Sequence, residues 1–503
     1  MTIGFLHIVG MVLTLALIAG VGVWSGRRVQ DAADFTTGGG KAGPWLVCGA
    51  IMGSLVSGQA TVGTAQLAFT YGLSAWWFTL GAGLGCLVLA VGYVIPLRRS
   101  GSVTLLQVVS GEFGPTAGYV GSVLCSIGIF ISVIAQVLAA SALITTLFPV
   151  GVLGAALISA AIMTVYVVFG GAWGAGMGGV VKLILLYAAC VIGCVLVLGG
   201  SGGPAALLDA VRALLTNAVL GESSGVTSNA AFQARYLSLT ARGAAKDLGS
   251  GVSLLLGVLA TQTYAQAIWS GKSDSAARKG ALLSALLIPP IGIACILIGL
   301  FMRGECVTAA EAAALAQAGQ AVPEGLITLS STAQVFPMFV LRHMPALLGG
   351  VVLGTLLITV VGGGAGLSLG VATILVNDIF KRLAPKLSDP DLKLKVTRLT
   401  LVGVLLAAAL ITAVVPGAVI NDFGFLSMGL RAAVVFFPMC AALFCPGRIH
   451  SRWALASITA GPAAVLVGNL ASLPFDPLFA GLLANAVLMG AGLLLSKPRD
   501  LQR

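Results

Sequence analysis

Residues 45–69 read WLVCGAIMGSLVSGQATVGTAQLAF, an apolar run whose middle is rich in glycine, hydroxyl and amide groups. The run is long enough to cross a membrane once, which takes about 20 residues of helix. Its small and polar residues are Gly53, Ser54, Ser57, Gly58, Gln59, Thr61, Gly63 and Thr64. Irregular backbone is tolerated at membrane depth only inside protein, so the pattern predicts a helix interrupted at a binding site. The alternative is that small residues only let neighbouring helices pack closely.

The whole chain has the composition of a protein that is dissolved in lipid. Hydrophobic residues make up 58% of its 503 residues, charged residues 9%, and the mean hydropathy is +1.06. A soluble domain carries roughly 25% charged residues. The net charge of +11 lies in short segments between apolar runs, where it sets membrane orientation, and this placement argues against a nucleic-acid partner. We therefore predict an all-α polytopic membrane protein whose main surroundings are the lipid bilayer.

Apolar runs bounded by glycine, proline and charge clusters predict thirteen transmembrane helices within one transporter domain, residues 1–503. The expected spans are 5–24, 44–69, 73–95, 116–148, 150–169, 178–199, 248–269, 280–302, 344–377, 399–415, 418–445, 452–468 and 473–495. Two longer connections lie at 200–247 and 303–343, and residues 307–320 favour a short surface helix.

The distribution of basic residues predicts the orientation. With the N-terminus outside, 19 of the 27 Lys and Arg residues fall in cytoplasmic segments and six in external ones. Cytoplasmic loops of membrane proteins carry this excess of positive charge. We expect a multi-pass protein of the cell (plasma or inner) membrane with a cytoplasmic C-terminus. The remaining two basic residues, Lys182 and Arg431, lie inside apolar spans.

The number of spans favours an inverted repeat of five plus five helices, a common plan of secondary transporters in which each repeat opens with a broken helix. The expected division is an extra helix at 5–24, a first repeat at 44–199, a second repeat at 248–445 and two C-terminal helices at 452–495. The second repeat would open with KDLGSGVSLLLGVLATQTYAQAIW, residues 246–269, whose polar cluster is Gln262, Thr263, Tyr264 and Gln266.

Five segments carry a resemblance to a known family. They are DFTTGGGKAGPW (34–45), SLVSGQATVG (54–63), TYGLSAWW (70–77), AQAIWSGKSDSAARKG (265–280) and ATILVNDIFKR (372–382). Together they resemble the sodium/solute symporter family, which includes bacterial proline and sialic acid permeases and sodium/glucose cotransporters. The resemblance implies a core of ten helices in an inverted repeat, with one extra helix before the core and two after it.

The family's sodium site is only partly matched. The resemblance places its backbone carbonyls at Gly53 and Val56, and its hydroxyl ligands at Gly362 and Gly363, which are glycines here. A hard cation needs several oxygen ligands, so the loss of two hydroxyls predicts a poor sodium site. The coupling ion expected from the resemblance is H+ or Na+, and we predict no other cofactor and no metal site.

In the fifth core helix of the family, an acidic residue linked to a further sodium site follows a Gly-Gly pair. The resemblance places Gly179 at that position here, and Lys182 lies one helical turn further on, on the same face. Here the pattern reads Gly170, Gly171, Gly178, Gly179 and then Lys182. We hypothesise that the ammonium group takes the place of sodium, as in related proton-driven transporters with a lysine in this helix. The alternative is a lysine that reaches the cytoplasmic interface, because its long stem can lie along apolar surface.

Arg431 lies near the middle of its span, where charge is costly and marks function by default. Guanidinium suits bidentate binding of a carboxylate or sulfonate. No Asp or Glu lies in the middle of a predicted span, so we expect an anionic substrate. The alternative role is structural bonding to a broken helix. Gln59 and Thr79 lie at or next to positions that contact substrate in the family, although both could be packing residues.

The predicted function is therefore a secondary transporter that imports a small organic anion, coupled to protons or independent of sodium. Nothing in the sequence resembles a nucleophile–base pair or metal cluster, so an enzyme is not expected, and the sequence says nothing of oligomeric state. A sensor built on the same fold is a second alternative, although the chain ends eight residues after Leu495. The first alternative is sodium-coupled symport of a small solute or amino acid, with hydroxyl ligands from Ser57, Thr359 or Ser368.

Overall fold

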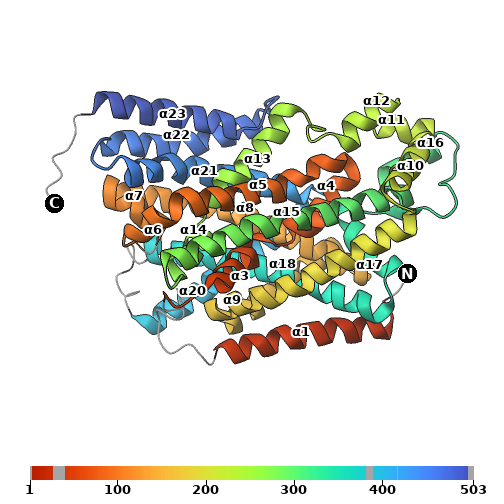
Figure 1. Ribbon diagram of the computed structural model, residues 1–503, viewed down its shortest axis with the longest axis horizontal. Coiled ribbons are helices and arrows are strands. Elements are labelled where there is room, and N and C mark those ends of the chain that lie inside the picture. Colours follow the sequence, from red (N-terminus) through yellow and green to blue (C-terminus); the bar gives the residue numbers. More distant parts are fainter. Residues whose placement is uncertain are drawn as a thin grey trace.

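The computed structural model describes residues 3–26, 40–102, 104–380, 384, 389–415 and 417–496, and helices form nearly all of its regular structure. Most helices run along the long axis of the molecule, and the two termini lie at opposite ends of that axis (Figure 1). The all-α membrane fold predicted from composition is confirmed.

The first half of the chain contains an isolated helix followed by a series of long and broken helices. Its elements are α1 (Phe5–Gly26), α3 (Pro44–Leu55), η2 (Gln59–Gly63), α4 (Thr64–Tyr71), η3 (Gly72–Trp76), α5 (Trp77–Val88), η4 (Leu89–Tyr93), α6 (Val94–Arg99), α7 (Leu105–Phe113), α8 (Pro115–Leu147) and α9 (Val152–Ser201).

The second half begins with short helices in a long connection. Its elements are α10 (Pro204–Leu215), α11 (Ala218–Ser223), α12 (Asn229–Phe232), η5 (Gln233–Leu237), α13 (Ala244–Leu259), α14 (Gln262–Ser270), α15 (Asp274–Glu305), β1 (Cys306–Thr308), α16 (Ala309–Gln317), β2 (Ile327–Leu329), η6 (Thr332–Gln334), α17 (Val335–His343), α18 (Ala346–Ile374), η7 (Leu375–Phe380), α20 (Pro390–Val414), α21 (Ile420–Phe444), α22 (Ser451–Leu470) and α23 (Leu478–Leu495).

The predicted count of thirteen spans is not confirmed. Within the described residues, nine helices are long and apolar enough to cross a membrane, or ten when the bent pair α13 and α14 is taken as one span. The two spans predicted at 150–169 and 178–199 form one continuous helix, α9. Glycine lowers helix stability without removing a backbone hydrogen bond, so a glycine-rich stretch without proline need not end a helix. The side chains of residues 167–178, which include Gly170, Gly171 and Gly178, lie outside the described part.

Both predicted helix interruptions are present. Helix α3 ends at Leu55, Val56 is extended with φ −82° and ψ 90°, and the chain resumes as the π-helical segment η2. Helices α13 and α14 meet at an angle of 45° around Ala260 and Thr261. These breaks leave carbonyl groups at the ends of α3 and α13 and amide groups at the starts of the following helices without intrahelical partners.

The helices at the two ends of the molecule differ in kind. Helices α10, α11, α12 and α16 gather at the end where the N-terminus lies, whereas α6 and α7 lie at the end of the C-terminus (Figure 1). The surface helix predicted at 307–320 is α16, and a capping box of Thr308 and Glu311 begins it. The parallel strand pair β1 and β2 beside it, with Cys306 opposite Ile327, was not predicted.

Candidate functional site

The break between α3 and η2 is held by one side chain from another helix. Gln136 of α8 donates from Nε2 to Ser57 Oγ over 2.8 Å, and its Oε1 accepts from the Gly58 amide over 3.0 Å. One buried amide therefore satisfies a backbone N–H that a continuous helix would have paired internally, and also bonds a hydroxyl beside it. Sequence analysis missed Gln136, although a glutamine in the apolar run of α8 is itself a signal.

Lys182 of α9 also bonds this break. Its Nζ donates to the carbonyl oxygens of Gly53 over 2.6 Å and Val56 over 2.9 Å, and the residue is only 5% exposed. Those carbonyls belong to the last turn of α3, where the helix dipole favours positive charge. Gly179, one turn earlier on α9, packs directly on the Gly49 carbonyl and lets the two helices approach. The lysine side chain thus points into the protein.

The two glycines at the positions of the family's hydroxyl ligands face different neighbours. A Cβ on Gly363 of α18 would lie 2.7 Å from the Cβ of Ser57, beside the break. A Cβ on Gly362 would instead lie 3.6 Å from the hydroxyl of Tyr166. Only Gly363 therefore adjoins the break directly, and it has no room there for a larger side chain.

Arg431 of α21 is 1% exposed and is bonded entirely to hydroxyl and carbonyl oxygens. Its Nη1 donates to Thr261 Oγ1 over 2.9 Å, at the break between α13 and α14. Its Nη2 donates to the hydroxyls of Ser427 and Ser132, and its Nε to the Ser427 carbonyl. Gly128 of α8 leaves room for the side chain. Across the described residues, neither Arg431 nor Lys182 forms an ion pair with a carboxylate.

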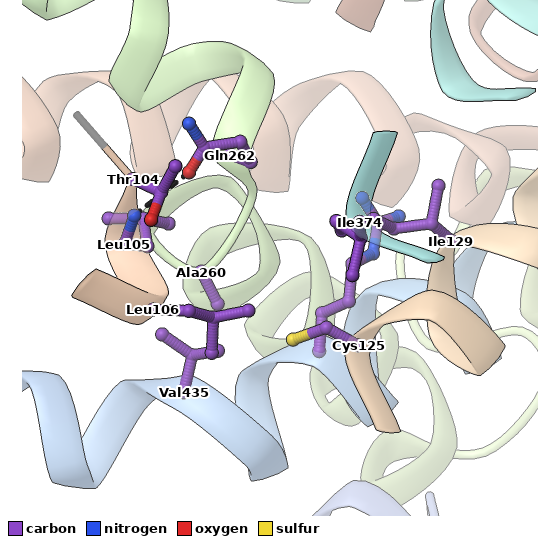
Figure 2. A pocket seen from close by; sticks show the side chains of 10 residues that line it. Thr104, Leu105, Leu106, Cys125, Ile129, Ala260, Gln262, Ile374 and Val435 are labelled. Atoms are coloured by element: carbon purple, nitrogen blue, oxygen red, sulfur yellow. Dashed lines mark hydrogen bonds between the residues drawn. The ribbon is translucent and has the colours of Figure 1, made fainter. Parts of the chain in front are cut away.

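A small cavity of about 40 Å³ adjoins Arg431 (Figure 2). It lies among the start of α7, α8, the α13–α14 break, the end of α18 and α21. Gln262 closes one side, because its Oε1 accepts from the Leu105 amide over 2.8 Å. A water molecule needs roughly 10–15 Å³ of such space, so the cavity can hold water but not an organic solute in this conformation.

The three predicted substrate residues do not form one cluster. Gln59 begins η2 and packs against Gly424 of α21, two turns from Arg431 on the same helix. Thr79 of α5 instead bonds the Trp76 carbonyl and packs against Gly292 of α15. The structure therefore packs Gln59 of η2 on the helix that carries Arg431, two turns away from it, and leaves Thr79 at a different helix interface.

A charged and aromatic layer lies next to Gln59 toward the end that holds α10 and α16. Arg242 donates to Asp247 over 2.6 Å and to Asp422 over 3.1 Å, and its guanidinium lies 5.1 Å from the centre of the Phe425 ring. Phe425 packs on Phe78 with ring centres 5.7 Å apart. Sequence analysis missed this layer because its members come from three distant segments of the chain.

Comparisons with known proteins identify the family. The sequence profile of the sodium:solute symporter family matches residues 35–461. The chain is a member of the sodium:solute symporter family. The Bacillus subtilis (strain 168) protein YwcA, named as an uncharacterized symporter, is 30% identical to this symporter over 200 residues. That match spans 39% of this chain and only 38% of the relative.

Solved structures share the fold of this symporter. A Na+-coupled sialic acid symporter in a substrate-bound outward-open state matches with a TM-score of 0.73 and 17% identity, over 99% of this chain and 100% of that one. Mhp1, a nucleobase-cation-symport-1 family transporter in a closed conformation, matches with a TM-score of 0.51 and 14% identity, over 93% and 98% of the two chains. This symporter is thus a multi-pass membrane protein of a family of transporters and not of enzymes, as predicted.

Proposed function

We propose that this symporter imports a small organic anion by alternating access and does not use sodium at the break between α3 and η2. The observation that carries this proposal is the pair of hydrogen bonds from Lys182 to the carbonyls of Gly53 and Val56. The ammonium group has the charge of a sodium ion and lies on the carbonyls that the family resemblance assigns to sodium. A second cation at that place would be repelled by about 4 kcal/mol at 4 Å in a partly polar interior.

The anionic character of the substrate follows from the charge balance of the buried helices. Arg431 and Lys182 are buried cations, and the carboxylates of the described residues pair with other groups or lie apart from them. Buried charge is costly unless a partner compensates it. Arg431 has only uncharged hydroxyl and carbonyl partners, so an anionic ligand would complete its site, with a carboxylate or sulfonate best suited to the planar guanidinium.

Sodium-coupled symport is the second candidate, and the family and its sodium-coupled structural relative favour it. The hydroxyls of Thr359 and Ser368 donate to carbonyls of their own helix, and the Ser57 hydroxyl accepts from Gln136. Each of these hydroxyl oxygens keeps a lone pair that could bind sodium. Because Lys182 already bonds the Gly53 and Val56 carbonyls, the sodium ion would have to bind at another place.

The coupling ion is tested on the purified full chain and its Lys182→Met variant. We expect the melting temperature of the parent to be the same in sodium chloride as in choline chloride, and uptake of a stabilising acid into proteoliposomes to need no sodium gradient. If Lys182 releases its proton during transport, the variant keeps substrate exchange but loses pH-driven accumulation; if it is a fixed cation, both are lost. Lys272→Met, on an exposed side chain, is the control. Strict, saturable sodium dependence of the parent would overturn the proposal.

Substrate charge is tested by thermal stabilisation with monocarboxylates, sulfonates and neutral amino acids. Arg431→Lys keeps the charge but loses the planar fork. We therefore expect the affinity for the stabilising anion to fall roughly tenfold or more, and to fall further in Arg431→Ala. A native substrate that is neutral, and whose binding neither change affects, would show that Arg431 has only a structural role.

A further inference from the structure

Two buried amide side chains each have one polar atom without a partner among the described residues. They are Nε2 of Gln59, a residue 3% exposed, and Oδ1 of Asn421, a residue with no exposed surface. A buried donor or acceptor without a hydrogen bond is strongly unfavourable, and such groups in native proteins call for an explanation. The two orphan atoms have opposite hydrogen-bonding character, one a donor and the other an acceptor.

The two amides lie on opposite sides of one helix interface. A Cβ on Gly424 of α21 would lie 3.0 Å from Gln59 Nε2, and a Cβ on Gly63 of η2 would overlap Asn421 Oδ1. Each amide therefore packs against a glycine of the partner helix. The orphan donor and the orphan acceptor therefore both lie at the interface between η2 and α21.

The orientation of the Asn421 amide is fixed by its neighbour. Thr64 Oγ1 donates its only hydrogen to the Gln59 carbonyl over 3.1 Å, so it can only accept from Asn421. Asn421 Nδ2 is the atom at that contact, 3.5 Å away, which leaves Oδ1 as the free acceptor.

A hydroxyl group is the simplest ligand group that satisfies both atoms, since it accepts one hydrogen bond and donates another. Next to this place, the rings of Phe78 and Phe425 form an apolar wall. The Arg431 guanidinium bonds Ser427, three residues from Gly424, which corresponds to about 4.5 Å along the axis of α21. Only a few atoms of a ligand would thus separate its hydroxyl from its anionic group.

We propose that Gln59 and Asn421 form a subsite for a hydroxyl group of the transported anion, so that the substrate is a short hydroxycarboxylate. The proposal rests on the proposed function for the role of Arg431, and it adds the substrate class. It also explains why the interface between η2 and α21 holds both an unsatisfied donor and an unsatisfied acceptor.

The test compares pairs of ligands that differ only in one hydroxyl, on the purified full chain by thermal stabilisation. The pairs are lactate and propionate, 3-hydroxybutyrate and butyrate, and the neutral pair lactamide and propionamide. We expect the hydroxylated acid of at least one acid pair to bind roughly tenfold or more tightly than its partner, because the partner leaves two buried groups unpaired. Asn421→Leu and Gln59→Met should each bring this ratio close to one while binding of the acid lacking the hydroxyl persists.

The failure of this proposal and the failure of the proposed function give different results. Arg431→Lys should weaken both acids of a pair and leave their ratio unchanged. Acids that bind without any preference for the hydroxyl would overturn the subsite and leave the anion transporter intact. Preference for lactamide without binding of any acid would support the subsite and overturn the anionic substrate. If no ligand of either kind stabilises the protein, both are overturned.

Discussion

At the scale of single residues, small side chains decide how closely other groups can approach the broken helix. Gly179 lets α9 pack on the end of α3, so that Lys182 reaches two carbonyls, and Gly128 leaves space for Arg431. Gly363 lies against Ser57 in the same region. The chemistry of the site therefore depends on residues that contribute no polar atoms of their own.

Gly363→Ala tests this dependence. The new Cβ would lie 2.7 Å from the Cβ of Ser57, and we expect a loss of roughly 1–3 kcal/mol in the free energy of unfolding, because overpacking forces the backbone to shift. Gly366→Ala on the same helix is the matched control, since nothing lies within 4 Å of its Cβ. Thermal unfolding in detergent provides the comparison. Equal melting temperatures of the two variants would contradict the packing described at the break.

At the scale of elements, α21 makes three contacts that link distant parts of the molecule. Its first turn carries Asp422, which pairs with Arg242. Its next turn packs Gly424 against Gln59, and its middle carries Arg431, which bonds the α13–α14 break. One helix thus contacts both broken helices, so a rotation or shift of α21 would affect both of them together.

The ion pairs of Arg242 allow a graded test of the layer at the start of α21. Asp247 is fully buried and Asp422 is 49% exposed, whereas the Arg242 side chain is 4% exposed. We expect Asp247→Asn to cost roughly 3 kcal/mol or more, because it removes the buried partner of a buried charge. Asp422→Asn should cost about 0–1 kcal/mol, as for other solvent-screened pairs. Melting temperatures in detergent measure both, and a larger loss for Asp422→Asn would contradict this assignment.

At the scale of the whole molecule, the ends differ in charge and in structure. The end that holds α10, α11, α12 and α16 carries few basic residues in the sequence-based assignment, and the end that holds α6 and α7 carries many (Figure 1). Positive charge is retained on the cytoplasmic side of membranes. The α10–α16 end is therefore expected to face outward.

Labelling of single added cysteines tests this orientation. Ala318 at the end of α16 and Ser275 at the start of α15 are both exposed and lie at opposite ends of the molecule. We expect a membrane-impermeant maleimide to label Ala318→Cys in intact cells and Ser275→Cys only after the membrane is opened. The parent chain, with its nine native cysteines, gives the background signal. The reverse labelling pattern would show that the N-terminus is cytoplasmic.

The sequence by itself determined that this protein lies in a lipid membrane, that it is helical, and where two of its helices break. These properties depend on local composition: lipid demands apolar spans, and clusters of small and polar residues such as 53–64 mark the irregular backbone. The sequence also singled out Lys182 and Arg431, because a charge within an apolar span is visible without any structure. It predicted two spans where the structure assigns one helix, α9, since glycines alone do not decide where a helix ends.

Only the tertiary structure decided what these residues contact. The partners of Lys182 lie more than a hundred positions away in the chain, and those of Arg431 come from α8, from the α13–α14 break and from α21 itself. The amide clamp of Gln136, the separation of Thr79 from Gln59, and the unpaired atoms of Gln59 and Asn421 also depend on how distant helices pack. Hydropathy and spacing describe one segment at a time, whereas hydrogen bonding across an interface depends on the relative position of two.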